Sequence, residues 1–201
     1  MQRRKVIGGR AYSKAELEKM LAGAGFSACK IYAVMPDLAR PQMLLADGYV
    51  PNEPIDVRIF PQYRSPETIF LEEERLYQTL LENRMFHQMA NGFLLECTAG
   101  GRLSEADQIT VQGDRGHADA QATLLTAGKQ VVKRALYPEG RQKTETLAEN
   151  AAYLRRRGVP IVDGRLQAGD YVMPYVAGQM ATVYFRETLQ RSRADFIREL
   201  E

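Results

Sequence analysis

Residues 12–46, YSKAELEKMLAGAGFSACKIYAVMPDLARPQMLLA, decide how the chain begins to fold. Ser13 and Glu16 form a capping box: the Ser13 hydroxyl accepts from a backbone amide of the first turn, and the Glu16 carboxylate accepts from the amide of Ser13. Apolar residues then recur at helical spacing and predict one face packed on a core, namely Leu17, Met20, Leu21 and Ala24. Gly25 ends this helix, because a residue without Cβ suits the left-handed closing conformation.

Two strands are expected after this helix. Residues 28–35 are rich in apolar and β-branched side chains, and residues 42–46 form a second apolar run. Pro36, Asp37 and Pro41 lie between them and are typical of a turn. The stretch therefore predicts a unit of helix, strand, turn and strand.

The remaining elements alternate between strands and helices. Ser65 and Pro66 begin a helix over 67–89 that breaks near Asn83, after a connector over 48–64. The other helices are expected at 144–157, closed by Gly158, and at 181–200, with Val183, Leu189, Phe196 and Ile197 buried. The other strands are expected at 93–98, 109–111, 121–125, 130–136, 159–162, 165–168 and 171–176, with a hairpin turn at 126–129. This pattern predicts an α+β fold in two parts, 1–98 and 108–201, separated by a turn-rich break.

Composition narrows the class of protein. The 201 residues are 45% hydrophobic and 26% charged, as in an ordinary soluble globular protein, and the net charge of +2 argues neither for nor against nucleic acid. The basic residues near the start of the chain predict a solvated tail. Cys29 and Cys97 lie far apart in the sequence and predict free thiols in a reducing compartment. No apolar run approaches the roughly 20 residues that span a bilayer, so we expect a cytoplasmic protein.

The segments SKAELEKMLAGAGF and KIYAVMPDLARPQMLL carry a resemblance. Together they resemble the last helix and final antiparallel strand pair of a class I S-adenosylmethionine-dependent methyltransferase, of the bacterial type linked to surface-polysaccharide assembly. The resemblance covers about a fifth of the chain and implies a Rossmann-like sheet that binds S-adenosylmethionine. The glycine-rich cofactor loop and the acidic ribose-binding residue of that family have no counterpart here, because Gly8-Gly9 is not preceded by a strand. We therefore expect a fragment of a longer methyltransferase-like protein, whose missing N-terminal portion would be its partner.

Residues 109–180 carry a second resemblance. Three strands, a helix and two strands follow one another as in the small N-terminal lobe of protein-kinase-like phosphotransferases. Gln130-Val131-Val132-Lys133 resembles the strand that carries the nucleotide-binding lysine, and Met173-Pro174-Tyr175 resembles the last strand and hinge of lipopolysaccharide- and aminoglycoside-kinase-like proteins. This resemblance implies contact with ATP through Lys133, Glu149 and Tyr175. Residues 113–116 are the candidate glycine-rich loop but lack the usual spacing, and neither a catalytic loop nor metal-binding carboxylates follow.

Each candidate site residue has a simpler interpretation. Lys133 is also compatible with a surface lysine, and Glu149 with a solvated helix face. Asp37 is typical of a turn beside Pro36, whereas the methyltransferase resemblance places Asp37, Arg40 and Tyr32 on the side that faces the substrate. The two histidines and two distant cysteines give no metal site.

The sequence therefore leaves three functions open. The first is a fragment of a methyltransferase of surface-glycan assembly that is inactive by itself and would contact a glycan or lipid-linked acceptor. The second is a non-catalytic binding or scaffold module. The third is a kinase-like lobe that contacts a nucleotide. Neither nucleic-acid binding nor a membrane span is expected.

Overall fold

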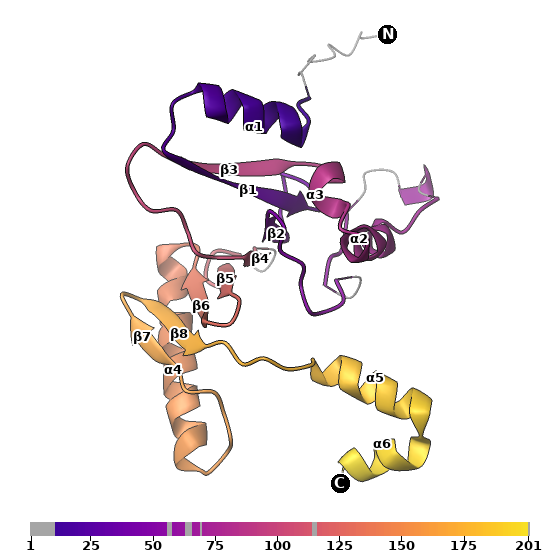
Figure 1. Ribbon diagram of the computed structural model, residues 1–201. Coiled ribbons are helices and arrows are strands. Elements are labelled where there is room, and N and C mark those ends of the chain that lie inside the picture. The colour runs from indigo at the N-terminus through magenta and orange to yellow at the C-terminus, as the bar shows by residue number, and fades with distance from the viewer. Residues whose placement is uncertain (1–10, 56–57, 63–65, 69, 114–115, 201) are drawn as a thin grey trace, which may run out of the picture.

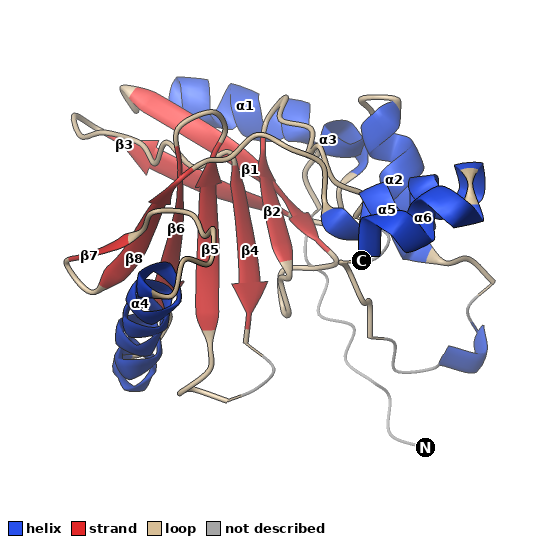
Figure 2. Cartoon of the chain, turned by 90° about the horizontal axis from the view of Figure 1, so that it is seen from below, coloured by secondary structure: helices blue, strands red, loops and turns tan. Residues whose placement is uncertain are grey.

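The computed structural model describes residues 11–55, 58–62, 66–68, 70–113 and 116–200. Within these residues the fold is mixed α/β, with one open, antiparallel sheet of eight strands in the order β3-β1-β2-β4-β5-β6-β8-β7. Figures 1 and 2 show that the strand direction turns strongly along this order, so that β1 and β3 run across the direction of β4 and β5. The helices lie outside the sheet.

The strands and helices have the following bounds. The strands are β1 (Ala28–Met35), β2 (Met43–Ala46), β3 (Phe93–Thr98), β4 (Gln108–Gln112), β5 (Gln121–Thr126), β6 (Gln130–Ala135), β7 (Arg165–Gln167) and β8 (Asp170–Pro174). The α-helices are α1 (Lys14–Gly23), α2 (Glu73–Glu82), α3 (Phe86–Met89), α4 (Arg141–Arg156), α5 (Ala181–Arg191) and α6 (Arg193–Leu200), and two short 3-10 helices are η1 (Pro66–Thr68) and η2 (Pro138–Gly140).

The core is built around β1 and β2, which are buried on both faces. One buried cluster includes Ala33, Met35, Met43 and Leu45 of these strands. The side chains that cover them come from α2, α3 and the connector after β2: Tyr77, Leu81, Phe86, Ile55 and Ile59. Tyr32, Val34, Leu44 and Ala46 form a second buried cluster on the other face. Burial on both faces explains why these two strands appear in the sequence as nearly continuous apolar runs.

Strand β2 joins the first part of the chain to the second. It pairs with β1 on one edge and with β4 on the other, in a register that sets Met43 opposite Thr110 and Leu45 opposite Gln108. Both parts of the chain therefore contribute strands to one sheet, although the sequence predicts a boundary between them at residues 99–107. The division into 1–98 and 108–201 stays a prediction.

The structure confirms several local predictions. Both hydrogen bonds of the Ser13–Glu16 capping box are present. The strands at 93–98, 121–125 and 130–136 form, and Gly128 has the positive φ of 72° that the hairpin turn requires. The helix over 67–89 breaks after Glu82, where Arg84 has a φ of 58°. Gly158 closes α4 with a φ of 76°.

Three predicted elements were wrong. Residues 159–162 are not a strand, because this segment closes the preceding helix: the amide of Val159 donates to the carbonyl of Leu154. The helix at 181–200 is two helices, since Ser192 is extended (φ −159°, ψ 117°) and its hydroxyl accepts from the amide of Asp195 to begin α6. Helix 67–89 begins only at Glu73, after the short η1, and Phe70 is fully exposed.

The predicted core face of the first helix is only partly buried. Leu17 and Leu21 are half-buried, but Met20 is 52% exposed and Ala24 is exposed. The buried residue of α1 is Lys14, whose ammonium lies 2.7 Å from Asp47 Oδ1. A charge pair, rather than an apolar stripe, thus attaches this helix to the end of β2.

Some expectations fall outside the described residues. They are the basic tail within residues 1–10, the cap at Ser65, and the centre of the candidate glycine-rich loop at 114–115. Among the described helices, none combines the length and the apolar character that crossing a bilayer demands.

Candidate functional site

The face of the sheet that carries Lys133 is covered by α4. Thr123 and Tyr171 lie directly opposite Lys133 in β5 and β8, and directly opposed residues of antiparallel strands share a face. Ala135, two residues further along β6, shares that face too. Ala135 lies close to Gly140 at the start of α4. A Cβ added at Gly140 would be 3.1 Å from the Ala135 Cβ. Lys133 therefore projects toward the side on which α4 packs.

The ammonium of Lys133 has no acceptor among the described residues, although its side chain is half-buried. The other two lysines that are not exposed in the described ranges do have acceptors. Lys14 binds Asp47, and Lys30 donates to the backbone carbonyls of Ser104 and Ala106 at 2.8 and 2.7 Å. Solvent or an anionic ligand is therefore left to meet the Lys133 ammonium.

Glu149 does not meet Lys133 in the structure. It lies exposed on α4, and no ion pair joins it to Lys133. The charged pairs at the end of α4 involve other residues: Arg155 Nε lies 2.9 Å from Asp163 Oδ1, and the guanidinium of Arg157 lies over the ring of Tyr153. The exposed position of Glu149 agrees with the simpler interpretation of a solvated helix face.

Tyr175 directly follows β8 and links the second part of the chain to the connector after β2. Its backbone amide donates to the carbonyl of Lys129 at 3.1 Å, which extends the pairing of β8 with β6 by one residue. Its hydroxyl accepts from Asn52 Nδ2 at 3.2 Å. The segment that resembles a hinge is thus held at both its backbone and its side chain.

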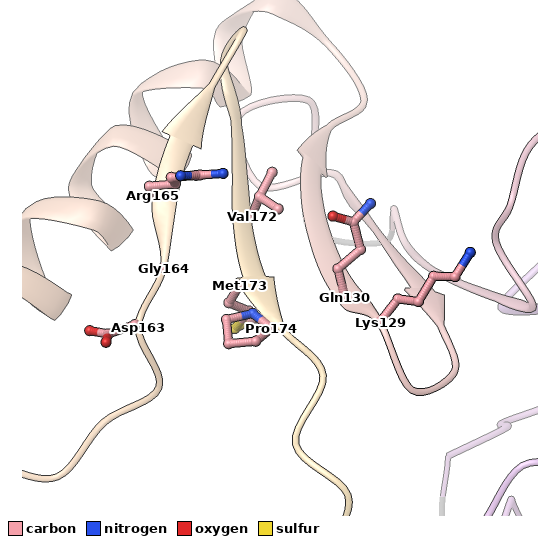
Figure 3. Close-up of a pocket in the computed structure, with 8 residues that line it drawn as sticks. All are labelled: Lys129, Gln130, Asp163, Gly164, Arg165, Val172, Met173 and Pro174. Carbon is pink, nitrogen blue, oxygen red and sulfur yellow. The ribbon is translucent and has the colours of Figure 1, made fainter.

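A shallow pocket of about 460 Å³ lies beside this segment (Figure 3). Its lining comes from the start of β6, the residues before and within β7, and the end of β8: Lys129, Gln130, Asp163, Gly164, Arg165, Val172, Met173 and Pro174. Two of its charged side chains are already paired, because Lys129 binds Glu105 and Asp163 binds Arg155. Lys133, Glu149 and Tyr175 are not part of this pocket, so it does not unite the residues that the sequence selects.

Arg134 and Asp170 form an ion pair on the opposite face of β6 and β8. The guanidinium donates from Nε and Nη2 to the carboxylate, with distances of 3.0 and 2.7 Å to Oδ2. This hydrogen bond raises the pKa of Arg134, in opposition to its partial burial. Sequence reasoning missed the pair, although the two-residue alternation of a strand indicates that Lys133 and Arg134 face opposite sides.

The turn at 36–41 brings Asp37 and Arg40 together. The Asp37 carboxylate accepts from the amides of Ala39 and Arg40 at 2.7 and 2.9 Å, as an aspartate does in a turn, and Arg40 donates to the side chain of Gln62. Both residues are exposed. Tyr32 is 1% exposed, and its hydroxyl donates to the carbonyl of Ala106 at 3.2 Å. Burial raises the pKa of this phenol. Tyr32 therefore lies in the core, apart from the surface of the turn.

The two cysteines, which are far apart in sequence, are neighbours in space. Cys29 of β1 lies directly opposite Cys97 of β3, and both are free thiols. The sequence holds no signal for this contact, because only the pairing of two distant strands creates it.

No group of three or more His, Cys, Asp or Glu side chains within the described ranges is arranged to hold a metal ion. The chain matches no protein-family model, no curated protein and no solved structure. What it does must therefore follow from its own geometry.

Proposed function

We propose that residues 108–176 form a nucleotide-contacting lobe, in which Lys133 meets phosphate oxygens. The order of elements supports the proposal. Strands β4, β5 and β6 are followed by α4 and then by β7 and β8, and α4 packs against β6, β7 and β8. This is the order of three strands, a helix and two strands on which the kinase-like resemblance depends.

The observation that carries the proposal is the half-buried side chain of Lys133, whose ammonium has no acceptor in the described residues. Lysine serves widely as a point charge for phosphate groups, since its compact ammonium can donate to several oxygens. We propose contact with ATP rather than phosphoryl transfer. A catalytic base and metal-binding carboxylates at the spacing of a phosphotransferase are not found in the sequence.

The test is thermal denaturation of the chain with and without ATP. At an ATP concentration about tenfold above Kd, binding to the folded state should raise Tm by about 3 to 6 °C. Lys133→Ala should abolish the shift, because it removes the cation that meets the phosphates. Lys19→Ala is the matched control: Lys19 is an exposed lysine of α1, and its loss should leave the shift intact.

Two outcomes would refute the nucleotide proposal. In the first, ATP leaves the melting curve unchanged at millimolar concentration. In the second, the Lys133→Ala variant shows the full shift, so that binding occurs elsewhere. The first outcome would favour a partner-binding or scaffold module without a nucleotide.

We also propose, as a second candidate, an ancestry among methyltransferases of surface-glycan assembly. Its support is the order of α1, β1, the turn and β2, together with the exposed Asp37 and Arg40 on that turn, which could face a glycan or lipid-linked acceptor. The sequence holds no glycine-rich loop after a strand, and we therefore expect the chain itself to bind no S-adenosylmethionine. Isothermal titration calorimetry provides the test, and micromolar binding would contradict this expectation.

A further inference from the structure

Cys29 and Cys97 meet at a position where two antiparallel strands bring side chains closest together. The backbone of Ile31 bonds toward β2, because the amide of Asp47 donates to its carbonyl at 3.0 Å. The backbone of Val34 bonds the other way, because its amide donates to the carbonyl of Gly92 beside β3 at 3.0 Å. Backbone groups alternate along a strand, so Cys29, like Ile31, directs its backbone away from β3.

The Cys29–Cys97 pair is therefore a non-hydrogen-bonded pair of the β1–β3 ladder. In such pairs the Cα atoms are about 4.5 Å apart, and the side chains lie on the same face. A disulfide needs a Cα separation of about 4.4 to 6.8 Å. The backbone thus already meets the distance that a disulfide requires.

The two thiols differ in accessibility. Cys29 is exposed and Cys97 is half-buried. Burial and the adjacent Cys29 thiol raise the pKa of Cys97. A reagent in solution therefore meets Cys29 first, and Cys97 lies beside it as the second thiol.

We propose that Cys29 and Cys97 form a reversible dithiol–disulfide site whose substrate is a low-molecular-weight disulfide. The thiolate of Cys29 attacks one sulfur of the reagent; a mixed disulfide forms, and one reagent thiol leaves. The thiolate of Cys97 then attacks the Cys29 sulfur, and the second reagent thiol leaves. The protein loses two electrons and two protons, and the reagent disulfide is reduced to two thiols.

The bond would fix an edge of the sheet. Strand β3 is the terminal strand in the order, and β1 is its sole neighbour there. An edge strand held on one side frays more readily than a central one. A covalent link between β1 and β3 also closes the long loop from Cys29 to Cys97, which limits the freedom of the unfolded chain.

Titration of the folded, reduced chain with oxidised glutathione tests the proposal. We expect both thiols to disappear together in a thiol assay, and the intact mass to fall by two hydrogens without a glutathione adduct. A dithiol reductant should restore both thiols. The oxidised form should melt on the order of 10 °C higher than the reduced form, as a closed long loop predicts.

Single variants separate the two roles. Cys97→Ser should accumulate a stable mixed disulfide at Cys29, because the second thiol is absent. Cys29→Ser should react more slowly, because only the half-buried thiol remains.

A double variant provides the geometric control. Cys97→Ser with Leu95→Cys keeps two thiols on one face, but shifts one of them by two residues along β3, to the position opposite Ile31. Such diagonal neighbours lie about 7 to 8 Å apart, so this variant should not close an internal bond. The proposal is overturned if the native chain binds glutathione separately at each cysteine, forms only intermolecular dimers, or does not react while folded. It is equally overturned if the double variant closes as fast as the native pair.

Discussion

At the scale of single residues, Tyr49 and His87 show how the connector after β2 is fixed to the core. His87 is 6% exposed, and its Nε2 lies 2.9 Å from the carbonyl of Tyr49. A carbonyl only accepts, so Nε2 carries the hydrogen, and the buried Nδ1 has no partner in the described residues. The side chain of Tyr49 packs against both buried clusters. The burial of His87 and its bond to Tyr49 agree with a structural role for this side chain.

The phenol of Tyr49 makes the stability of the protein depend on pH in the alkaline range. Burial is the main cause that raises the pKa of Tyr49 from 10.0 to about 12, and the nearby Tyr175 is the second cause. The folded protein holds this proton more tightly than the unfolded chain does. The contribution of this proton to the free energy of unfolding is therefore fully present below pH 10 and is lost as the pH rises toward 12. We expect Tyr49→Phe to lose less of its free energy of unfolding than the native chain between pH 10 and 12, as measured by urea denaturation. Parallel losses in the two proteins would contradict this assignment.

At the scale of elements, one buried ring, that of Tyr171, packs the β7–β8 hairpin against the residues before β7. Tyr171 is 3% exposed, and Gly164, just before β7, lies against its ring. Thr144 of α4 donates from its hydroxyl to the carbonyl of Gly169, in the turn of the same hairpin. The hairpin and α4 therefore hold each other in position and define the side of the sheet toward which Lys133 projects.

A methyl group at Gly164 should disturb this packing. A Cβ there would lie 2.3 Å from the Tyr171 ring, and the buried ring has little room to move. We expect Gly164→Ala to lower the free energy of unfolding by about 1 to 3 kcal/mol, which is typical of overpacking. Gly178→Ala is the control, because a Cβ at Gly178 meets no atom within 4 Å and should change stability little. Equal denaturation midpoints for the two variants would show that the ring yields freely.

At the scale of the whole molecule, the sheet and several side-chain contacts join the two parts of the chain. Strand β4 pairs with β2, and the hydroxyl of Tyr175 accepts from Asn52. Helices α5 and α6 pack chiefly on each other, with the rings of Phe185 and Phe196 in edge-to-face contact at 5.9 Å. Figure 1 shows these two helices extending beyond the sheet after β8.

The continuous sheet predicts that both parts unfold together. Separation of β2 from β4 would expose backbone groups of two central strands, which is costly. We expect hydrogen exchange followed by mass spectrometry in increasing urea to show one midpoint for peptides of β1–β3 and of β5–β8. Two separate midpoints would instead favour the division at residues 98–108 that the sequence predicts.

The sequence predicted the local features of the candidate site but not its contacts. It identified the strand of Lys133, the helix of Glu149 and a strand over 171–176, which in the structure ends at Pro174. It could do so because hairpin turns and helix ends depend on nearby residues. It could not decide between the two interpretations of Glu149, nor predict that Lys133 has no acceptor in the described part of the chain. Those facts depend on how α4 packs across strands that are distant along the chain.

The sequence by itself determined the capping box, the hairpin at Gly128 and the order of most strands and helices. These features arise from interactions within a few residues, and chemistry at that range is written in the residue order. Only the tertiary structure decided that β2 joins β4, that Tyr32 is buried and that Cys29 meets Cys97. Each of these depends on which distant strands pair and in which register, and many pairings satisfy the same alternation of apolar and polar residues until the core selects one.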